Sequence, residues 1–464
     1  MPPDILLLIL DTARADAFEP WGGPHASPEL ARLCEGGTWF TQAISTAPWT
    51  LPSAASLLSG LPPSQHGINA WAYRWNGPRP TSPASAVRGY AGPWLPDDLR
   101  ARGYETWAVS CNPWVSTWGG FDRGFDRFED VRPWPPLPKS KVGWAIRRCR
   151  QVSGQRGHGG REAFRVFSRW LGRDRRGPRF ALVNLMEMHA PYDPPFRMHP
   201  LVRRDRASAG AAGLLYRQLR QMDLRQRPDA AYVGAIRALY LAAGRYADRL
   251  VGRFVRAFVE GSSGPSAVIV VSDHGENLGD HGLFAHHSSL HESLLHVPLV
   301  VRGRGVDLAA GRVDEPRSLA GLPGWILEMA EGTEGPPSLP GPVLSEYEST
   351  RRHIATPREI RARAGRDGAE GLPALLDHAG LAVRDGSKKY VALDDGRQYL
   401  YDLGSDPAEA RDLLAEDPTR AEPFRPTRDD WLRRLDRLEA VERPEGETAD
   451  REIADHLKTL GYIE

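Results

Sequence analysis

The residues most able to do chemistry gather between Asp273 and His287. Four histidines and three acidic residues fall within these fifteen positions, directly after the mostly apolar run 267–272. An adjacent carboxylate and imidazole, as in Asp273 and His274, offer one oxygen and one nitrogen ligand to a divalent cation. Packing alone does not explain this density, so we interpret the segment as functional. Three further histidines follow on a loop where they could meet an anionic substrate or its leaving group: His281, His286 and His287.

Asp11 ends a second apolar run, 5–10. A carboxylate at the end of a buried strand can bind a hard cation through oxygen. The alternative is an Asp that caps the following helix, and the segment by itself favours that alternative. Asp11 is therefore a metal-ligand candidate only together with the other segments.

Thr50 stands before a stretch of small residues, in which Pro52 can occupy a first helical turn. The Thr50 hydroxyl would then lie at the positive end of the helix dipole. A metal ion there would lower the pKa of the hydroxyl and make it a usable nucleophile. Plain helix capping explains the same pattern, and this segment alone does not separate the two interpretations.

His189 follows the run 180–184 and precedes a proline-rich turn. A catalytic histidine and an ordinary loop histidine fit this position equally well.

Four short runs, apolar on both faces, predict the buried strands that must position these residues: 5–10, 106–110, 180–184 and 267–272. Helical stretches at 95–102 and 230–260 separate them. Such alternation is typical of an α/β protein with a mostly parallel sheet covered by helices on both faces. Ligands bind beyond the carboxyl ends of strands in such sheets, where Asp11 and Asp273 stand.

A smaller C-terminal part is predicted after a loop-like stretch at 332–342. This gives a catalytic domain over residues 1–335 and a subdomain over 336–464 that completes the active-site cleft. Runs at 380–384, 389–393 and 398–403 are typical of an antiparallel sheet, with hairpin turns at Asp385-Gly386 and Asp395-Gly396. We interpret the arginine-rich stretch 133–177 as an insertion with a solvated helix, in preference to a polyanion site.

Composition argues against several classes of function. The 464 residues include 60 basic and 59 acidic side chains, a formal net charge of +1, so no overall field favours nucleic acid. No apolar run approaches the roughly 20 residues of a membrane span, and no basic segment of the signal-peptide kind precedes the run 5–10. The three cysteines form no CxxC pair and indicate no disulfide framework. A cytoplasmic protein is expected.

Taken in order, these segments resemble the sulfatase family of the alkaline-phosphatase superfamily. The resemblance spans nearly the whole chain and includes D-T-x-R-A-D at 11–16, T-x-P-S at 50–53, H-x-P-Y at 189–192, S-D-H-G at 272–275, H-V-P-L-V at 296–300, L-Y-D-L-G-S-D-P at 400–407 and L-K-T-L-G-Y-I at 457–463. It implies an alkaline-phosphatase-like fold. It also implies one divalent metal ion, Mn, Ca, Zn or Mg, held by Asp11, Thr50, Asp273 and His274. Finally, it implies that the transferred group contacts His189 and either His286 or His287.

The departures from the family pattern bear on the chemistry. Sulfatases convert a Cys or Ser to formylglycine within a C/S-x-P-x-R pattern, whereas this chain has Thr50 there and Ala54 in place of the Arg. The methyl on the Thr β-carbon prevents oxidation to the aldehyde, so no formylglycine is expected. Thr12 replaces the usual second Asp. Other residues stand in the region of the usual G-K-W-H-L-G segment: Ser110, Cys111 and Asn112.

A Thr nucleophile with an Asp-His metal pair is similar instead to phosphodiesterases, phosphonate monoester hydrolases and phosphoethanolamine transferases. The thirteen-residue spacing from Asp273 to His286 particularly resembles the transferases. The primary hypothesis is metal-assisted hydrolysis of a phosphate, phosphonate or sulfate ester through a covalent Thr50 intermediate. Phosphoesters are favoured, because a sulfated Thr cannot eject sulfate by collapsing to an aldehyde.

The substrate would be a small molecule or an ester derived from a glycan or a lipid. Two alternatives remain: transfer of a phospho group to an acceptor other than water, and a non-catalytic homologue that keeps the metal site. Oligomer formation is left open. Four tryptophans could line an apolar or sugar-binding wall, although core packing is favoured for each: Trp49, Trp71, Trp75 and Trp114.

Overall fold

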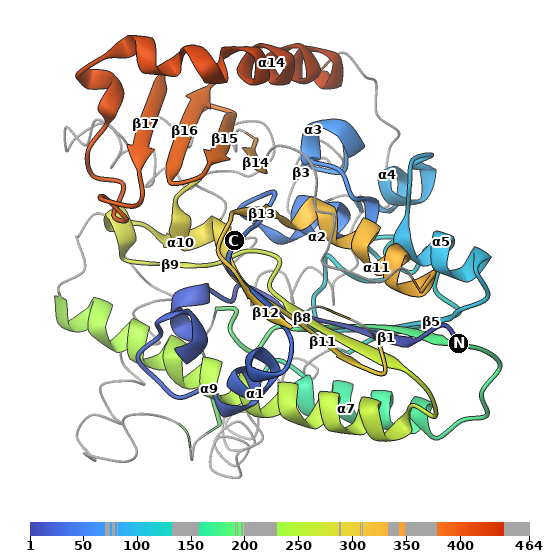
Figure 1. Ribbon diagram of the computed structural model, residues 1–464. Coiled ribbons are helices and arrows are strands. Elements are labelled where there is room, and N and C mark those ends of the chain that lie inside the picture. Colours follow the sequence, from blue (N-terminus) through green and yellow to red (C-terminus); the bar gives the residue numbers. More distant parts are fainter. Residues whose placement is uncertain are drawn as a thin grey trace.

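The computed structural model describes residues 1–69, 75–76, 79–80, 82–131, 157–190, 192, 194–195, 198, 230–286, 289–306, 308, 310–332, 343–348 and 378–439. Its centre is a nine-stranded, mostly parallel sheet (Figure 1). The α/β class and the mostly parallel sheet predicted from the sequence are confirmed. The candidate His287 and the motif at 457–463 lie outside the described residues.

Strand β1 (Asp4–Leu10) runs through the middle of the sheet and is buried along its whole length. It pairs in parallel with β8 (Ser266–Val271) and with β7 (Arg179–Leu185), and β7 pairs in parallel with β5 (Glu105–Ser110). These four strands coincide with the four predicted apolar runs. Because they have helices on both sides, both faces of each strand need apolar residues.

The sheet continues outwards on either side of these four strands. Beyond β8 lie β11 (His296–Arg304), which is antiparallel to its neighbours, and β2 (Thr38–Ile44). Short strands finish that edge: β12 (Gly311–Val313) and β13 (Arg317–Ser318). Beyond β5, the opposite edge is β6 (Arg127–Asp130).

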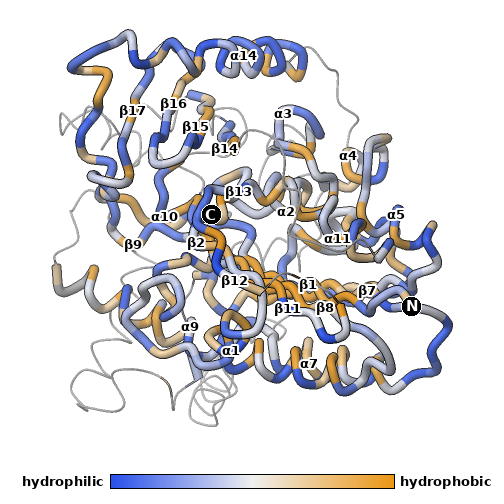
Figure 2. The backbone as a smooth tube through the Cα atoms, in the orientation of Figure 1, coloured by the Kyte–Doolittle hydropathy of each residue, from blue (hydrophilic) through white to orange (hydrophobic). Residues whose placement is uncertain are grey.

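Helices cover both faces of the sheet (Figure 1). One face carries α1 (Pro28–Glu35), α7 (Gly160–Leu171) and the long α9 (Ala230–Gly261). The other carries α2 (Thr50–Ser59), α5 (Leu95–Ala101) and α11 (Leu322–Ala330). The hydrophobic strands between these two helical layers stand out in Figure 2.

The interpretation of 133–177 as an insertion with a solvated helix is wrong for its described part. Helix α7 buries Phe167 and Trp170, and Trp170 meets Trp107 of β5 edge to face with ring centroids 6.1 Å apart. Phe167 packs against Phe254 of α9 at 5.1 Å. The apolar face of α7 therefore covers the main sheet, and its arginines occupy the other face of the helix.

A separate four-stranded antiparallel sheet confirms the predicted C-terminal hairpins. Its strands are β14 (Val343–Tyr347), β15 (Gly380–Asp385), β16 (Lys388–Leu393) and β17 (Gln398–Asp402). Gly386 and Gly396 both have positive φ, which the turns require. The sequence pattern missed β14, and the predicted boundary at 335/336 falls outside the described residues, so it stays a prediction.

The small sheet is buried on both faces. Helix α14 (Arg425–Glu439) packs Trp431 and Leu435 on one face. The other face packs against Ile44, Leu290 and Leu295 of the main body. Short helices complete the described fold: α3 (Pro63–His66), α4 (Ala84–Gly89) and α10 (Glu292–Leu295). Within the described ranges, no helix combines the length and the apolar composition of a membrane span.

Candidate active site

The carboxyl ends of four parallel strands meet at one edge of the main sheet. Leu10 of β1 pairs with Leu185 of β7, and Ile9 pairs with Val271 of β8. The strands end nearly level, so the residues that follow them are brought together. Asp11 follows β1, His189 follows β7, Asp273 and His274 follow β8, and Asn112 follows β5.

Thr50 is the first residue of α2, and its side chain is completely buried. The loop before it is held from two sides. Ser45 donates its hydroxyl to the carbonyl oxygen of Asp273 and its backbone N–H to Leu295 O (2.8 Å). From the small sheet, Ser345 Oγ donates to Ser45 O over 2.6 Å, and Glu346 N donates to Thr46 O over 2.8 Å. Strand β14 thus contacts the loop that leads into Thr50.

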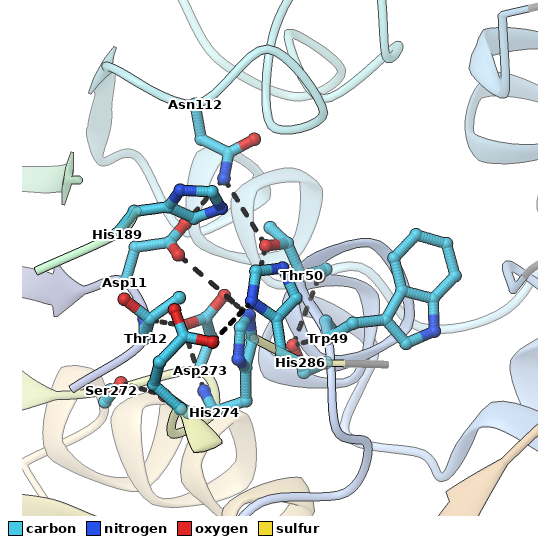
Figure 3. Close-up of polar contacts among 12 residues, drawn as sticks. Asp11, Thr12, Trp49, Thr50, Asn112, His189, Ser272, Asp273, His274 and His286 are labelled. Carbon is cyan, nitrogen blue, oxygen red and sulfur yellow. Dashed lines mark hydrogen bonds and ion pairs between the residues drawn. The ribbon is translucent and has the colours of Figure 1, made fainter. Parts of the chain in front are cut away.

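The four predicted metal ligands lie together (Figure 3). Nε2 of His274 is 3.2 Å from Thr50 Oγ1, 3.6 Å from Asp273 Oδ2 and 3.9 Å from Asp11 Oδ1. Nδ1 of His274 lies 2.8 Å from the carbonyl oxygen of Gly275. Because a carbonyl oxygen only accepts, Nδ1 carries the proton, and the lone pair of Nε2 faces the group.

The donor set fits a divalent cation. Asp273 Oδ1 accepts the backbone N–H groups of Thr12 and His274, which leaves Oδ2 for another partner. Asp273 Oδ2 and Asp11 Oδ1 are buried and have no hydrogen-bond partner among the residues that the structure describes. One ligand atom from each of Asp11, Asp273 and His274 lies within 4.8 Å of the others. Two carboxylate oxygens, an imidazole nitrogen and a hydroxyl are suitable ligands for such an ion.

The electrostatics of the two carboxyl groups also favour a cation. Burial raises the pKa of Asp11 well above its ordinary value, and the neighbouring Asp273 carboxylate raises it further. Burial likewise raises the pKa of Asp273. Two buried carboxylates repel each other, so a positive ion between them would stabilise both charges.

A strained residue supports Asp273. Thr12 has φ 59°, in the left-handed region that non-glycine residues rarely adopt. This conformation points its N–H to Asp273 Oδ1 (3.3 Å), while its carbonyl oxygen accepts the Tyr240 hydroxyl over 2.7 Å. Strain of this kind costs about 1–3 kcal/mol and is concentrated at functional sites.

His189 and His286 lie beside the metal-ligand group. The ring centroid of His286 is 4.7 Å from that of His274 and 5.0 Å from that of His189. His189 and His286, to which the family resemblance assigns contact with the transferred group, are therefore both at the site, whereas His281 stacks on His291. Burial lowers the pKa of His189 and that of His286 well below 6.5, and neighbouring imidazoles lower both further.

Asn112 is a site residue that sequence reasoning did not assign. Its amide nitrogen donates to Asp11 Oδ2 over 2.5 Å and lies 3.4 Å from Thr50 Oγ1. Its side-chain oxygen Oδ1 accepts the backbone N–H of Trp114 over 2.7 Å, which fixes the orientation of the side-chain amide. A signal was present in the sequence, because Asn112 follows a buried strand just as Asp11 and Asp273 do.

Trp49 and Trp114 belong to the core. Both are buried, and their rings meet edge to face with centroids 5.9 Å apart. Both tryptophans therefore pack in the core, as the sequence analysis favoured. Nothing is concluded for Trp71, which lies outside the described residues, or for the side chain of Trp75.

A second group of metal-binding residue types is less suitable for an ion. His281, His291 and Glu409 each place a ligand atom within 4.8 Å of the others. The two imidazole rings, however, stack at 3.7 Å with only 9° between their planes, so their lone pairs cannot converge on one ion. The ammonium of Lys389 already lies 2.7 Å from Glu409 Oε1. The group around Asp11 is therefore the better candidate for a metal site.

Carboxylates, imidazoles and a hydroxyl lie together at the carboxyl ends of a mostly parallel sheet, and these groups are suited to hydrolytic catalysis. The chain belongs to the sulfatase family, whose model matches residues 3–332. Arylsulfatase K of Xenopus laevis is 29% identical over 195 residues, which are 40% of this chain and 35% of that relative. The chain thus spans about a third of that relative's length.

Solved structures share the fold over nearly the whole chain. A phosphonate monoester hydrolase of Agrobacterium radiobacter has a TM-score of 0.62 and 20% identity, covering 94% of this chain and 95% of its own. A protein solved with its substrate, D-glucosamine-2-N,6-O-disulfate, has a TM-score of 0.64 and 14% identity, and the match covers 94% of this chain and 98% of that protein. One fold therefore serves phosphonate and sulfate chemistry, and the choice between them depends on the site.

Proposed function

We propose that this protein hydrolyses phosphate or phosphonate esters through a covalent intermediate on Thr50. The observation that carries the proposal is the position of Thr50 Oγ1, buried at the first turn of α2 and 3.2 Å from His274 Nε2. A divalent cation held by Asp11, Asp273, His274 and Thr50 would polarise the ester oxygens and lower the pKa of the Thr50 hydroxyl.

The residues of this chain supply the remaining parts of the reaction. Thr50 Oγ1 forms a bond to phosphorus while the bond from phosphorus to the ester oxygen breaks. The proton that Thr50 Oγ1 loses is accepted by Nε2 of His189 or His286 and then passes to the departing ester oxygen. A water molecule then attacks the phosphorus of phospho-Thr50, which releases the acid and restores the hydroxyl. The backbone N–H groups at the start of α2 favour the negative charge that develops there.

The side chain of Thr50 favours phosphorus over sulfur. A formylglycine hydrate releases sulfate when it collapses to the aldehyde, and the methyl group of Thr50 prevents formation of that aldehyde. A sulfated Thr50 would have to be cleaved by water at sulfur. Sulfate ester hydrolysis is the second candidate function, which the family and the sulfated ligand of one structural neighbour favour.

The test compares nitrophenyl phosphodiester, phosphonate monoester and sulfate ester substrates in wild type, Thr50→Ala and Thr50→Ser. Phosphorus substrates are expected to give the larger kcat/KM. Thr50→Ala should lower kcat by at least about 1,000-fold, because the nucleophile is lost, and Thr50→Ser should retain much of it. Mass spectrometry of acid-quenched enzyme should find the transferred group on the peptide that contains Thr50.

Thr46→Ala is the matched control, since Thr46 is a buried threonine of the same loop. It should retain activity. Undiminished turnover in Thr50→Ala would rule out Thr50 as the nucleophile. A higher kcat/KM for the sulfate ester would favour the second candidate function instead.

A further inference from the structure

The histidines at the site share one arrangement, because each has Nδ1 within hydrogen-bond distance of an oxygen atom of the protein. Nδ1 of His274 lies 2.8 Å from the carbonyl oxygen of Gly275, and Nδ1 of His189 lies 2.5 Å from that of Ala190. A carbonyl oxygen accepts and never donates, so the proton is on Nδ1 in both rings. In these two cases the backbone of the next residue sets the tautomer.

In His286 a side-chain oxygen stands in the place of the backbone carbonyl. Its Nδ1 lies 3.1 Å from Oε1 of Glu276, ten residues earlier in the chain. Both side chains are buried. Of the three acceptors, only this one can be removed by mutation without changing the main chain.

His286 follows a short and irregular backbone segment. Ala285, immediately before it, has φ 61° in the left-handed region, and β10 (Phe284–Ala285) is only two residues long. The hydrogen bond to Glu276 restricts rotation of the imidazole and favours one tautomer.

Glu276 is itself held firmly. Its N–H donates to Ser293 O over 3.0 Å, and its carbonyl oxygen accepts from Arg14 Nη1 over 3.1 Å. Arg14 is anchored in turn by Asp280, 2.7 Å away. The hydroxyl of Tyr192 faces the same carboxyl group. The first motif of the chain (Arg14), the H-x-P-Y motif (Tyr192) and the loop after β8 therefore meet at Glu276.

We propose that Glu276 is a positioning residue, which accepts the Nδ1 proton of His286 and thereby directs His286 Nε2 to the transferred group. The inference deepens the proposed function and rests on it, because that function gives His286 Nε2 its contact with the substrate. Glu276 touches neither the substrate nor Thr50 in this role and acts through His286 alone.

A double-mutant cycle tests this directly, using the full-length protein and the nitrophenyl substrate it turns over fastest. Glu276→Ala should lower kcat about 10- to 100-fold with little change in KM, the size typical for loss of a supporting partner. His286→Ala should lower kcat at least as far. The double variant should be no slower than His286→Ala, because Glu276 has nothing left to position. Glu276→Gln keeps an acceptor oxygen and should lose less than Glu276→Ala.

Asn277→Ala provides the matched control. Asn277 is the buried neighbour of Glu276, and its Oδ1 accepts the Ser293 hydroxyl over 2.6 Å. The fold-loss in kcat caused by Asn277→Ala should multiply with the fold-loss caused by His286→Ala, as expected for a structural residue that acts independently of His286. Independent, multiplying effects of Glu276→Ala and His286→Ala would overturn the proposal, as would wild-type kcat in Glu276→Ala. If Glu276→Ala does not fold, the cycle is run with Glu276→Gln, with thermal midpoints recorded for each variant.

Measuring Thr50→Ala with the same substrate separates the two hypotheses. Full activity in that variant rejects the proposed function, while the cycle still reports whether Glu276 acts through His286. Loss of activity in Thr50→Ala together with multiplying effects in the cycle rejects the role of Glu276 alone.

Discussion

Asn112 donates its side-chain amide to Asp11 Oδ2 over 2.5 Å, although 101 residues separate the two in the sequence. The same nitrogen lies 3.4 Å from the Thr50 hydroxyl. A neutral amide thus connects a proposed metal ligand with the proposed nucleophile. The contact depends on β5 and β1 both pairing with β7, which brings their carboxyl ends to one edge.

Removal of this amide should slow the reaction. A hydrogen bond to a charged group contributes about 1.5–3 kcal/mol, so Asn112→Ala should lower kcat/KM roughly 10- to 100-fold. Asn112→Asp should be more damaging, since it places a carboxylate against Asp11. Steady-state kinetics check both variants, and Ser116→Ala on the same loop serves as a control. Equal activity of Asn112→Asp and wild type would contradict the assignment.

Removal of a divalent metal should both inactivate and destabilise the protein. Dialysis against a chelator should abolish turnover and lower Tm, because Asp11 and Asp273 then repel each other. Metal at 100 times its Kd should restore about 2.7 kcal/mol of stability. Asp273→Asn should eliminate the metal-induced rise in Tm, measured by differential scanning fluorimetry with Mn²⁺, Zn²⁺, Ca²⁺ and Mg²⁺.

Asp248→Asn is the matched control for that experiment. Asp248 is a buried carboxyl group that accepts the N–H of Leu30 at the start of α1 (2.9 Å). This variant should have a lower Tm and yet keep the metal-induced rise. A metal response that survives Asp273→Asn would place the ion elsewhere.

His66 should make stability depend on pH. Burial lowers the pKa of His66 from 6.5 to about 3. Its Nδ1 accepts the Ile68 N–H over 2.9 Å, so the native state has no place for a second ring proton. Between pH 6.5 and 3 the unfolded chain binds that proton and the native state does not. The contribution of neutral His66 is therefore complete above pH 6.5 and decreases as pH falls, by about 1.4 kcal/mol per unit.

Urea unfolding of wild type and His66→Gln at pH 7.5, 6 and 5 measures this dependence. The difference between their free energies of unfolding should shift in favour of the variant as pH falls. Ser56→Ala, which removes the hydroxyl 3.1 Å from His66 Nε2, should reduce stability without changing the slope. A pH-independent difference between wild type and His66→Gln would refute the prediction.

Gly275→Ala should be strongly destabilising. A Cβ atom at Gly275 would stand 2.1 Å from the carbonyl oxygen of Ser293, a backbone atom that cannot move aside easily. Overpacking typically lowers the free energy of unfolding by about 1–3 kcal/mol and occasionally by more. We expect the loss for Gly275→Ala to lie at the upper end of that range. Chemical denaturation or soluble yield gives the readout.

Gly324→Ala provides the comparison, because Gly324 lies within α11 and a Cβ atom added there would have no described atom within 4 Å. Alanine there should stabilise the protein by about 0.5–1 kcal/mol, since it favours the helix. Similar stabilities for the two alanine variants would contradict this explanation of the glycine in the S-D-H-G motif.

The sequence by itself determined the four central parallel strands of the main sheet and several of the residues at their ends. Apolar runs bounded by polar residues are local patterns, and burial on both faces of β1, β7 and β8 requires them. Because parallel strands end at a shared edge, the proximity of Asp11 and Asp273 followed from those runs. Thr50 and His286 came from the order of the motifs, and the structure places both beside that edge.

Only the tertiary structure decided which other side chains complete the site. Asn112, Glu276 and strand β14 act through contacts with residues distant in the sequence or across a loop, and no local periodicity encodes such contacts. The burial of α7 shows the same limit, since its many arginines conceal an apolar face that exists only once the helix is formed and packed. Side-chain hydrogen bonds depend on distances of a few tenths of an ångström, which packing of the whole chain sets.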